Sequence, residues 1–302
     1  MSILVVGSVA LDTVKTPFGQ ASEVLGGSAT YFAAAASFFA DVRLVAVVGE
    51  DFPDHHLEFL RARNVDLRGL QRVPGRTFRW VGEYGFDLND ARTLDTQLNV
   101  FADFAPKIPE EYRDSAVVFL ANIDPDLQRE VLRQVSRPAL IAADTMNYWI
   151  AGKRDSLRQT LRLVDTLLIN DAETRQLAGE GNLVQAARKI LTWGPRALVI
   201  KRGEYGALMF NGGDWFSAPA LPLEVIRDPT GAGDCFAGGF IGSLANTMNF
   251  EDAGVRKAMI MGSVMASFNV EAFSLDRLRS LTYADIETRY RVFKRLAHFE
   301  EL

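Results

Sequence analysis

The chain has 302 residues, with 33 basic and 38 acidic side chains, which gives a net charge of −5 at neutral pH. Its length fits one large α/β domain with a small appendage, and 48% apolar residues predict a packed core. No run of lysine or arginine indicates a nucleic-acid surface, and no continuous apolar run is long enough to span a membrane. The single cysteine, Cys235, excludes an intramolecular disulfide. Because the N-terminus also lacks a leader pattern, we expect a cytoplasmic protein without nucleic-acid or membrane partners.

Short apolar runs rich in β-branched residues recur along the chain, and a turn signal follows each of them. Runs that are apolar throughout are typical of strands buried on both faces, as in a parallel sheet. Helical patterns lie between them, which predicts βαβ units and an α/β fold. The predicted strands are residues 3–7, 42–49, 116–122, 139–145, 166–170 and 197–203, and the predicted helices between them begin near residues 28, 54, 127 and 183.

One region departs from this pattern. Residues 78–101 alternate apolar and polar side chains around the turn DLNDA, which predicts two exposed antiparallel strands. Residues 11–25 add another extended segment, and we predict that these segments form a small β lid over the main sheet; an edge hairpin without a role is the alternative. The predicted domains are residues 1–10, 26–72 and 102–302 for the large domain, and 11–25 and 73–101 for the lid.

After Asp228 the chain becomes mainly helical, beginning with the stretch DPTGAGDCFAGGF. Gly231 and Gly233 let consecutive backbone amides point the same way at the start of a helix, where unpaired N–H groups favour an anion. Asp234 follows in the first turn. An acid next to an anion site is expected where the acid takes a proton from a hydroxyl and the amides hold a phosphoryl group. This arrangement predicts phosphoryl transfer. Glycine and aspartate are also common turn and capping residues, so this stretch alone leaves a structural role open.

This stretch resembles the C-terminal signature of the ribokinase family of sugar and nucleoside kinases, also called the PfkB family. Three further segments follow in family order. GGSATYFAAAASFF at 26–39 resembles the N-terminal Gly-Gly helix motif, NDAE at 170–173 resembles the Asn-x-x-Glu motif, and KRGEYGALMF at 201–210 resembles the nucleotide turn. The resemblance extends from Leu4 to about Phe273. It implies a ribokinase-like three-layer α/β/α sandwich with a mostly parallel central sheet and a small β-sheet lid.

The resemblance also implies roles for matching residues. Asp234 matches the catalytic base. Asn170 and Glu173 match the pair that organises Mg²⁺ through water, although Glu173 also reads as a first-turn acid that the helix dipole stabilises. The matching anion hole for the transferring phosphate is formed by the amides of Gly231, Ala232 and Gly233.

ATP and Mg²⁺ are the cofactors that the resemblance implies, and a monovalent cation such as K⁺ near residues 228–230 is common in the family. Family members often carry threonine at the position of Lys201. Here the lysine either reaches a phosphate directly or pairs with Glu204. The implied ATP-binding residues are Lys201, Gly203, Gly206, Thr230, Gly231 and Gly233.

On the acceptor side, Asp12 matches the acid that grips substrate hydroxyls, although it also reads as a plain turn residue. Gly26 and Gly27 match positions where the substrate approaches the backbone closely. Tyr31 stands where ribokinase-like members usually have an asparagine, which predicts a less polar or ring-stacking site. The lid adds four aromatic side chains that share one face if residues alternate; they cover the substrate or form a homodimer contact. These are Phe78, Trp80, Tyr84 and Phe86.

The resulting hypothesis is an ATP-dependent kinase that phosphorylates a hydroxyl of a small polyhydroxylated molecule. A sugar is the first choice of acceptor, and an adenosine-type nucleoside or inositol is the alternative. A non-catalytic ligand-binding relative is the alternative from a different class. A nicotinamide-dependent oxidoreductase is disfavoured, because the first strand ends in VVGSVALD and lacks Gly-x-Gly-x-x-Gly. We interpret Cys235 as a small buried packing residue.

Overall fold

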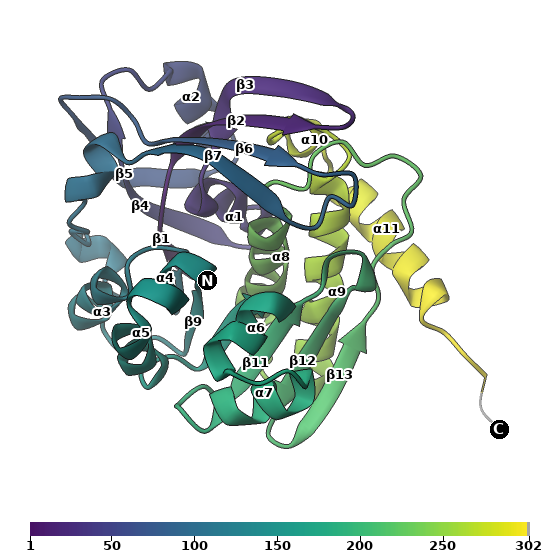
Figure 1. Cartoon of the computed structure of the whole chain (residues 1–302). Coiled ribbons are helices and arrows are strands. Elements are labelled where there is room, and N and C mark those ends of the chain that lie inside the picture. Colours follow the sequence, from purple (N-terminus) through teal and green to yellow (C-terminus); the bar gives the residue numbers. More distant parts are fainter. Residues whose placement is uncertain (301–302) are drawn as a thin grey trace.

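The computed structural model describes residues 1–300 and contains two sheets. The larger sheet has nine strands in the order β13-β12-β11-β10-β9-β8-β1-β4-β5, and the strands from β11 to β5 run parallel (Figure 1). Strands β12 and β13 extend it antiparallel. Their bounds are β1 Ser2–Val6, β4 Asp41–Gly49, β5 Val65–Val73, β8 Val117–Leu120, β9 Leu140–Asp144, β10 Thr166–Asn170, β11 Ala197–Lys201, β12 Ala207–Asn211 and β13 Asp214–Ala218.

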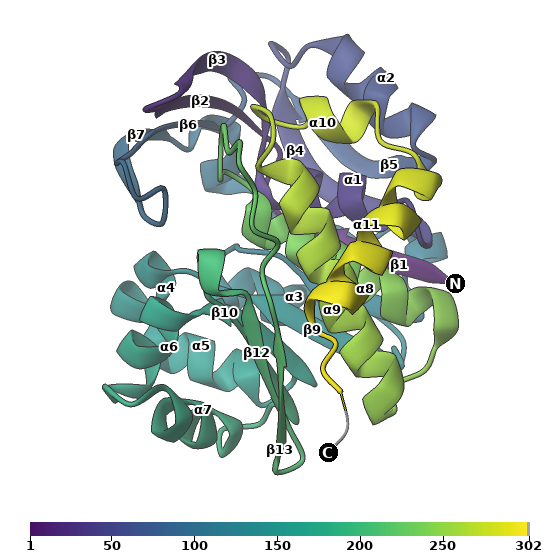
Figure 2. The ribbon, with the colours of Figure 1, turned by 90° about the vertical axis from the view of Figure 1, so that its right-hand side faces the viewer.

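Helices cover both faces of this sheet, as Figure 2 shows from the side. Successive strand residues face opposite layers, so Val117 and Phe119 belong to one apolar core and Val118 and Leu120 to the other. This arrangement confirms the predicted three-layer α/β/α sandwich. The first core is covered by α1 Ser28–Ala36, α2 Asp54–Ala62, α8 Ala232–Thr247, α9 Asp252–Asn269, α10 Asp276–Arg279 and α11 Tyr283–Leu296. The second is covered by α3 Pro125–Gln134, α4 Asn147–Gly152, α5 Arg154–Leu161, α6 Asp171–Ala178 and α7 Leu183–Leu191.

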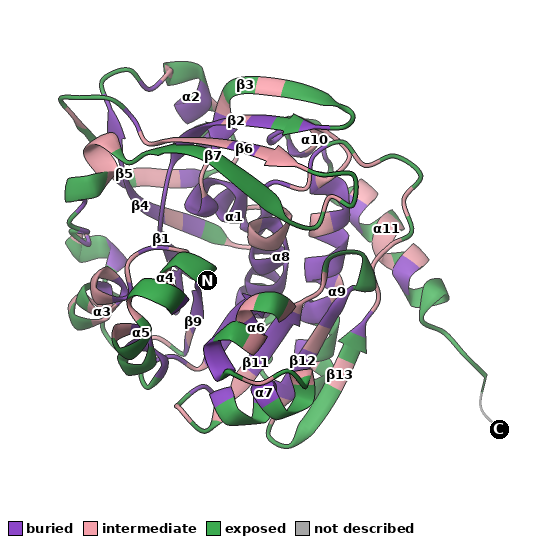
Figure 3. Ribbon diagram, in the orientation of Figure 1, coloured by how far each residue is buried: buried purple, intermediate pink, exposed green. Residues whose placement is uncertain are grey.

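The second sheet, which we call the lid, has the strand order β3-β2-β6-β7. Two antiparallel hairpins meet in a parallel pair between β2 and β6, so the sheet is mixed. The small separate β-sheet is confirmed. Of the two predicted exposed strands, β7 is exposed at every residue, whereas β6 is half-buried (Figure 3). The division of the chain into two domains stays a prediction. The lid strands are β2 Ala10–Thr16, β3 Gly19–Gly26, β6 Arg79–Tyr84 and β7 Ala91–Gln97.

The sequence analysis missed three strands, β5, β12 and β13, and three α-helices, α4, α5 and α10. Strand β5 carries charged residues at several positions because it forms an edge of the large sheet, and β12 and β13 form a short antiparallel extension at the other edge. The predicted lid strand that ended at Phe101 ends instead at Gln97, and a 3-10 helix follows at Asn99–Asp103. A period-2 pattern does not distinguish these short segments from turns.

Helix α8 is buried at the centre of the molecule, between α1 and α9 (Figure 3). A Cβ at Gly238 would lie 2.5 Å from the Phe32 carbonyl of α1, and a Cβ at Gly239 would lie 2.7 Å from Met265 of α9. These glycines therefore serve close helix packing. The tight packing fixes where the N-terminus of α8 points.

Candidate active site

Three neighbouring parallel strands end in polar residues on the same edge of the large sheet. Strands β9, β10 and β11 end at Asp144, Asn170 and Lys201. The Lys201 Nζ donates to Asp144 Oδ2 at 2.8 Å, across the intervening strand β10. Ligands of open α/β sheets bind outside the carboxyl ends of the strands, so this edge is the expected place for a site.

The glycine turn before α8 faces this edge. Gly231 precedes α8 in the left-handed conformation, with φ 75°, and a Cβ there would overlap the ring of Tyr31. A Cβ at Gly233 would lie 3.0 Å from Lys201 Nζ, so the ammonium rests against the turn. The amide of Ala232 donates to the Pro229 carbonyl at 3.1 Å, so it is already paired. Of the three predicted anion-hole residues, the structure therefore shows Gly233 beside the lysine, Gly231 against Tyr31, and Ala232 with its amide bonded within the turn.

Asp234 lies in the first turn of α8 and is partly buried. Burial raises its pKa to about 8; the charge of Asp144 adds to the rise and that of Lys201 opposes it. Asp12 and Glu173 also raise the pKa. A carboxylate with a pKa near neutrality is suited to accept a proton.

Asp12, on the lid strand β2, is the acid whose charge reaches Asp234 from the lid. It is 4% exposed, and burial raises its pKa to about 7, opposed by a hydrogen bond from the Gly27 amide. A Cβ at Gly26 would overlap the Asp12 carboxylate, and Gly27 has φ 96° beside the Ser8 carbonyl. Both predicted glycines are therefore required by the backbone around Asp12, whatever they contribute to a substrate.

Asn170 and Glu173 form a capping box at the start of α6. The Asn170 side chain accepts from the Glu173 amide at 2.7 Å, and Glu173 Oε2 accepts from the Asn170 amide at 3.1 Å. Burial raises the pKa of Glu173 to about 7, and Asp144 adds to the rise. Within residues 1–300, His, Cys, Asp and Glu side chains form no group of three able to hold a metal. Because the capping bonds already occupy these oxygens, the pair fits Mg²⁺ held through water rather than by direct ligands.

The predicted nucleotide turn lies at the end of β11. Gly203 has φ 53°, and a Cβ there would lie 2.8 Å from Oδ1 of Asn89, at the tip of the lid loop between β6 and β7. Gly206 has φ 81°, and a Cβ there would overlap the Ala218 carbonyl, so it is needed for the turn into β12. Lys201 pairs with Asp144 and not with Glu204, so that predicted partner is wrong.

The lid reaches the glycine turn through Tyr84. Its hydroxyl lies 3.3 Å from Thr230 Oγ1, and burial raises its pKa. Thr230 is held by its amide, which donates to Asp228 Oδ1 at 2.8 Å. Tyr31 is 1% exposed, and its hydroxyl has no hydrogen-bond partner in the described residues.

The aromatic side chains of the lid do not form one continuous face. The Trp80 ring lies over Gly82 and donates to Thr93, whereas Phe78 stacks on Phe101 with ring centroids 5.3 Å apart. Phe86 is 88% exposed, because strand β6 ends at Tyr84 and the alternation ends with it.

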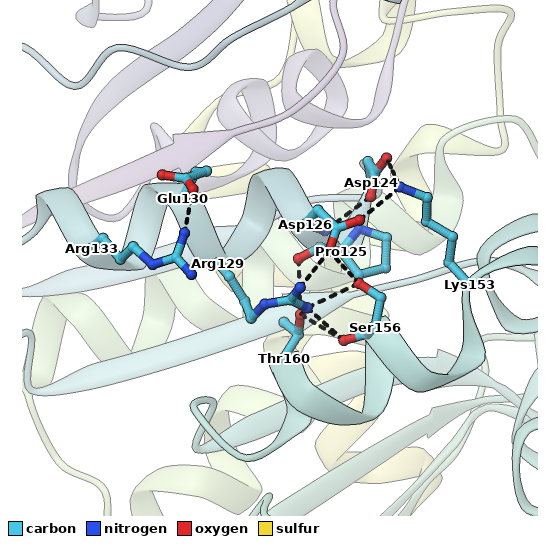
Figure 4. Close-up of polar contacts among 9 residues, drawn as sticks. All are labelled: Asp124, Pro125, Asp126, Arg129, Glu130, Arg133, Lys153, Ser156 and Thr160. Carbon is cyan, nitrogen blue, oxygen red and sulfur yellow. Dashed lines mark hydrogen bonds and ion pairs between the residues drawn. The ribbon is translucent and has the colours of Figure 1, made fainter.

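Helix α3 is braced against the α4–α5 junction by the polar network shown in Figure 4. Lys153 Nζ donates to Asp124 at 2.6 Å and to Asp126 at 2.7 Å. The Lys153 hydrogen bond lowers the pKa of Asp126 to about 2. Arg129 also pairs with Asp126, so the charged groups at the start of α3 satisfy one another.

The same helix holds the end of β9. Nε2 of Gln128, a buried α3 residue, donates to the carbonyls of Ala121 and Asp144, at 3.0 Å each. The bond connects the ends of β8 and β9. The Asp144 backbone is thereby fixed beside the site.

Asp144 is the main site residue that sequence reasoning missed. It is the last but one residue of the predicted strand ALIAADT and the last residue of β9, so a charged residue at the end of a buried run was the available signal. Cys235 is fully buried, as predicted, and its thiol contacts Asn269 Oδ1 at 3.3 Å.

The structure combines a mostly parallel α/β sandwich with a glycine turn and an acid at the start of one helix, an arrangement expected of a phosphotransferase. The chain matches the family described as pfkB family carbohydrate kinase over residues 2–277, and it belongs to that family. It is a phosphotransferase, an ATP-dependent kinase of a small polyhydroxylated substrate, as the sequence predicted.

Relatives with assigned names include sugar and nucleoside kinases. The cytidine kinase of Thermococcus kodakarensis is 32% identical over 83% of this chain and 91% of its own length. The 2-dehydro-3-deoxygluconokinase of Thermoproteus tenax is 32% identical over 72% of each chain.

Solved structures share the fold. The nucleoside kinase of Burkholderia thailandensis in complex with inosine has a TM-score of 0.79 at 20% identity, covering 96% of this chain and 97% of that chain. An E. coli protein assigned as ribokinase II, in complex with ATP and Mg²⁺, has a TM-score of 0.78 at 20% identity, covering 98% and 99%. Among residues 1–300, no helix is both long and apolar enough to cross a membrane.

Proposed function

We propose that Asp234 is the general base of the phosphoryl transfer. The acceptor oxygen attacks the terminal phosphorus of ATP, the bond from that phosphorus to the bridging oxygen breaks, and ADP leaves. The hydroxyl proton passes to Asp234. The observation that carries this role is the placement of Asp234 one residue after Gly233, beside Lys201 and the turn of Gly231.

The nucleotide binds along the carboxyl ends of β10 and β11 in this proposal. Lys201, Gly203, Gly206 and Thr230 line its path, and the amides at the glycine turn stabilise the negative charge on the transferring phosphoryl group. Asn170 and Glu173 hold Mg²⁺ through water, and the bound ion would neutralise phosphate charge.

A monovalent cation near residues 228–230 is part of the proposal. Asp228 is 1% exposed there, and burial raises its pKa. Its two oxygens accept from the amides of Thr230 and Ser274. Turnover in K⁺ that exceeds turnover in tetramethylammonium at equal ionic strength would support the cation; equal rates would refute it.

For the acceptor, we propose a molecule with vicinal hydroxyls, gripped by Asp12 beside Gly27. The cytidine kinase relative makes a ribonucleoside the first acceptor to test, ahead of a free sugar or inositol. Trp80 favours this order, since it pairs in register with Asp12 and is only half-buried on the lid. Tyr31 packs against the glycine turn. Its phenol makes the acceptor site less polar than the asparagine that ribokinase-like members usually carry at this position.

The test is an ADP-release assay with nucleosides, sugars and inositol in parallel. Nucleoside-dependent turnover would support the proposed acceptor, and sugar-only turnover would refute it. If no alcohol gave turnover while ATP still bound, the chain would be a non-catalytic ligand-binding relative.

We also propose that the chain forms a homodimer through the lid, in the cytoplasm where ATP is supplied. Strands β3 and β7 are open lid edges, and Leu94 on β7 is 51% exposed. A cavity of about 220 Å³ on the lid is lined by residues including Leu11, Thr13 and Arg79. Light scattering that shows a dimer for the wild type and a monomer for Leu94→Asp would support this assembly; a monomeric wild type would refute it.

A further inference from the structure

Lys201 is a cation among acids: its charge lowers the pKa of Asp234, whereas the charges of Asp144, Asp12 and Glu173 raise it. Its side chain is 18% exposed and that of Asp144 is 5% exposed. The charges of Asp144, Asp234 and Glu173 all favour the protonated lysine. The ammonium therefore has more than one candidate partner, and the structure shows it on Asp144 at 2.8 Å.

The Asp144 carboxylate is itself fixed in place. One oxygen accepts from the Thr145 amide at 2.7 Å, and the other accepts from Lys201. The Asp144 carbonyl accepts from Gln128 of α3, so both its side chain and its backbone are held. A carboxylate held in this way presents one oxygen in a constant direction.

A buried ion pair is weak evidence for stability, because the desolvation of both groups opposes the attraction between them. The position of this pair is what distinguishes it. The Lys201 ammonium that Asp144 holds lies against the glycine turn, because a Cβ added to Gly233 would lie only 3.0 Å from its Nζ. An ammonium at that place can meet a negative phosphoryl group that the turn also binds.

We infer that Asp144 is a positioning residue, which holds the Lys201 ammonium at the glycine turn to meet the terminal phosphoryl group of ATP and keeps it from pairing with Asp234. The inference rests on the proposed function of Asp234 and Lys201. It adds a residue that no family motif in this sequence pointed to. Without Asp144, Lys201 would turn to Asp234, and an ion-paired carboxylate is a weaker base.

The experiment compares Asp144→Asn, Lys201→Met and the double variant with the wild type. Asp144→Glu serves as the conservative replacement. Asp165→Asn is the matched control. Asp165 also forms an ion pair, with Arg196 at 2.7 Å, but this pair lies at the amino ends of β10 and β11, opposite the ends where Asn170 and Lys201 lie. The measurements are kcat, KM for ATP, and the ratio of affinities for AMP-PNP and ADP by titration calorimetry. Thermal denaturation confirms that each variant is folded.

We expect Asp144→Asn to lower kcat by about 10- to 100-fold while KM for ATP changes by less than about threefold. In the Lys201→Met background, the same change should lower kcat by less than about twofold, because Asp144 then has no lysine to position. Asp144→Glu should recover part of the loss, and Asp165→Asn should leave kcat unchanged. Both Asp144→Asn and Lys201→Met should reduce the preference for AMP-PNP over ADP.

An Asp144→Asn variant with wild-type kcat would overturn the inference. So would an equal loss of kcat in the Lys201→Met background, since Asp144 would then act without the lysine. Absence of turnover in the wild type on every alcohol would refute the proposed function instead. In that case the ratio of affinities for AMP-PNP and ADP still tests the role of Asp144 and Lys201. An unchanged preference for AMP-PNP in both Asp144→Asn and Lys201→Met would overturn that role.

Discussion

Replacing Asp234 with asparagine separates the proposed chemistry of this carboxylate from its effect on folding. Asparagine has nearly the same size and keeps a hydrogen-bond acceptor, but it cannot take a proton at neutral pH. We expect kcat to fall by about 10²- to 10⁴-fold, the usual contribution of a positioned general base. The KM for ATP should change little, because the lysine and the glycine turn remain.

The same change should stabilise the folded protein. Burial and the charge of Asp144 raise the pKa of Asp234 from 3.8 to about 8, against the opposing charge of Lys201. At about 1.4 kcal/mol per pKa unit, that shift corresponds to roughly 6 kcal/mol. Because Asp234 is partly exposed, solvent screening reduces this figure, and we expect about 2 kcal/mol.

The pH dependence follows from the direction of the shift. A carboxyl whose pKa is raised in the folded state binds more protons there than in the unfolded chain, so the wild-type stability falls as pH rises from about 4 to about 8. Asparagine removes this loss. The stability gain of Asp234→Asn should therefore be absent near pH 4 and complete above about pH 8.

Urea denaturation at about pH 5 and about pH 8.5 measures this gain, and an ADP-release assay measures turnover on the same preparations. Asp165→Asn is the control for a carboxylate outside the site. Turnover within tenfold of the wild type would refute the role of base. A stability difference that is equal at both pH values would refute the raised pKa.

Three further changes test other parts of the site. Glu173→Gln keeps the capping box and removes a buried carboxylate whose pKa is raised to about 7, so we expect no loss of stability and an increase of about tenfold or more in the Mg²⁺ concentration for half-maximal turnover; unchanged Mg²⁺ dependence would contradict the metal role. Gly26→Ala places a Cβ on the Asp12 carboxylate, and we expect KM for the acceptor to rise about tenfold or more with KM for ATP unchanged; an equal rise in both would contradict a role limited to the acceptor. Tyr84→Phe removes the 3.3 Å contact with Thr230, and we expect kcat/KM for the acceptor to fall about three- to tenfold without loss of Tm; wild-type kinetics would show that this lid contact is not used.

The large sheet was predictable because its strands are buried on both faces. Runs such as those of β1 and β10 are continuous and apolar, which is typical of strands buried on both faces, as in a parallel sheet. Edge strands give no such signal. The residues of β5 mix charged and apolar side chains, and the edge strand β13 is mostly exposed, so neither shows the continuous apolar run of the inner strands. Strand β12 lies within the segment that resembled the nucleotide turn.

The site was predictable only where a motif fixes the backbone. Gly231 needs a left-handed conformation and Gly27 needs φ 96°, so glycine itself carries the information at both positions. The Lys201–Asp144 pair has no such signal, because 57 residues separate its partners and two strands bring them together. Side-chain partners across a sheet depend on strand order, which local sequence patterns do not specify.

The distribution of charge around the glycine turn connects fold stability to chemistry. Asp12, Glu173 and Asp234 all have pKa values raised to about 7 or 8, chiefly by burial. A fold selected for stability alone would not bury these acids where their charges act on one another, since each lowers stability as it ionises. A general base, in contrast, is most effective when its pKa lies near the working pH. Lys201 limits the rise in the pKa of Asp234, and Asp144 limits how strongly Lys201 does so, so the base strength depends on the balance between one cation and its fixed partner.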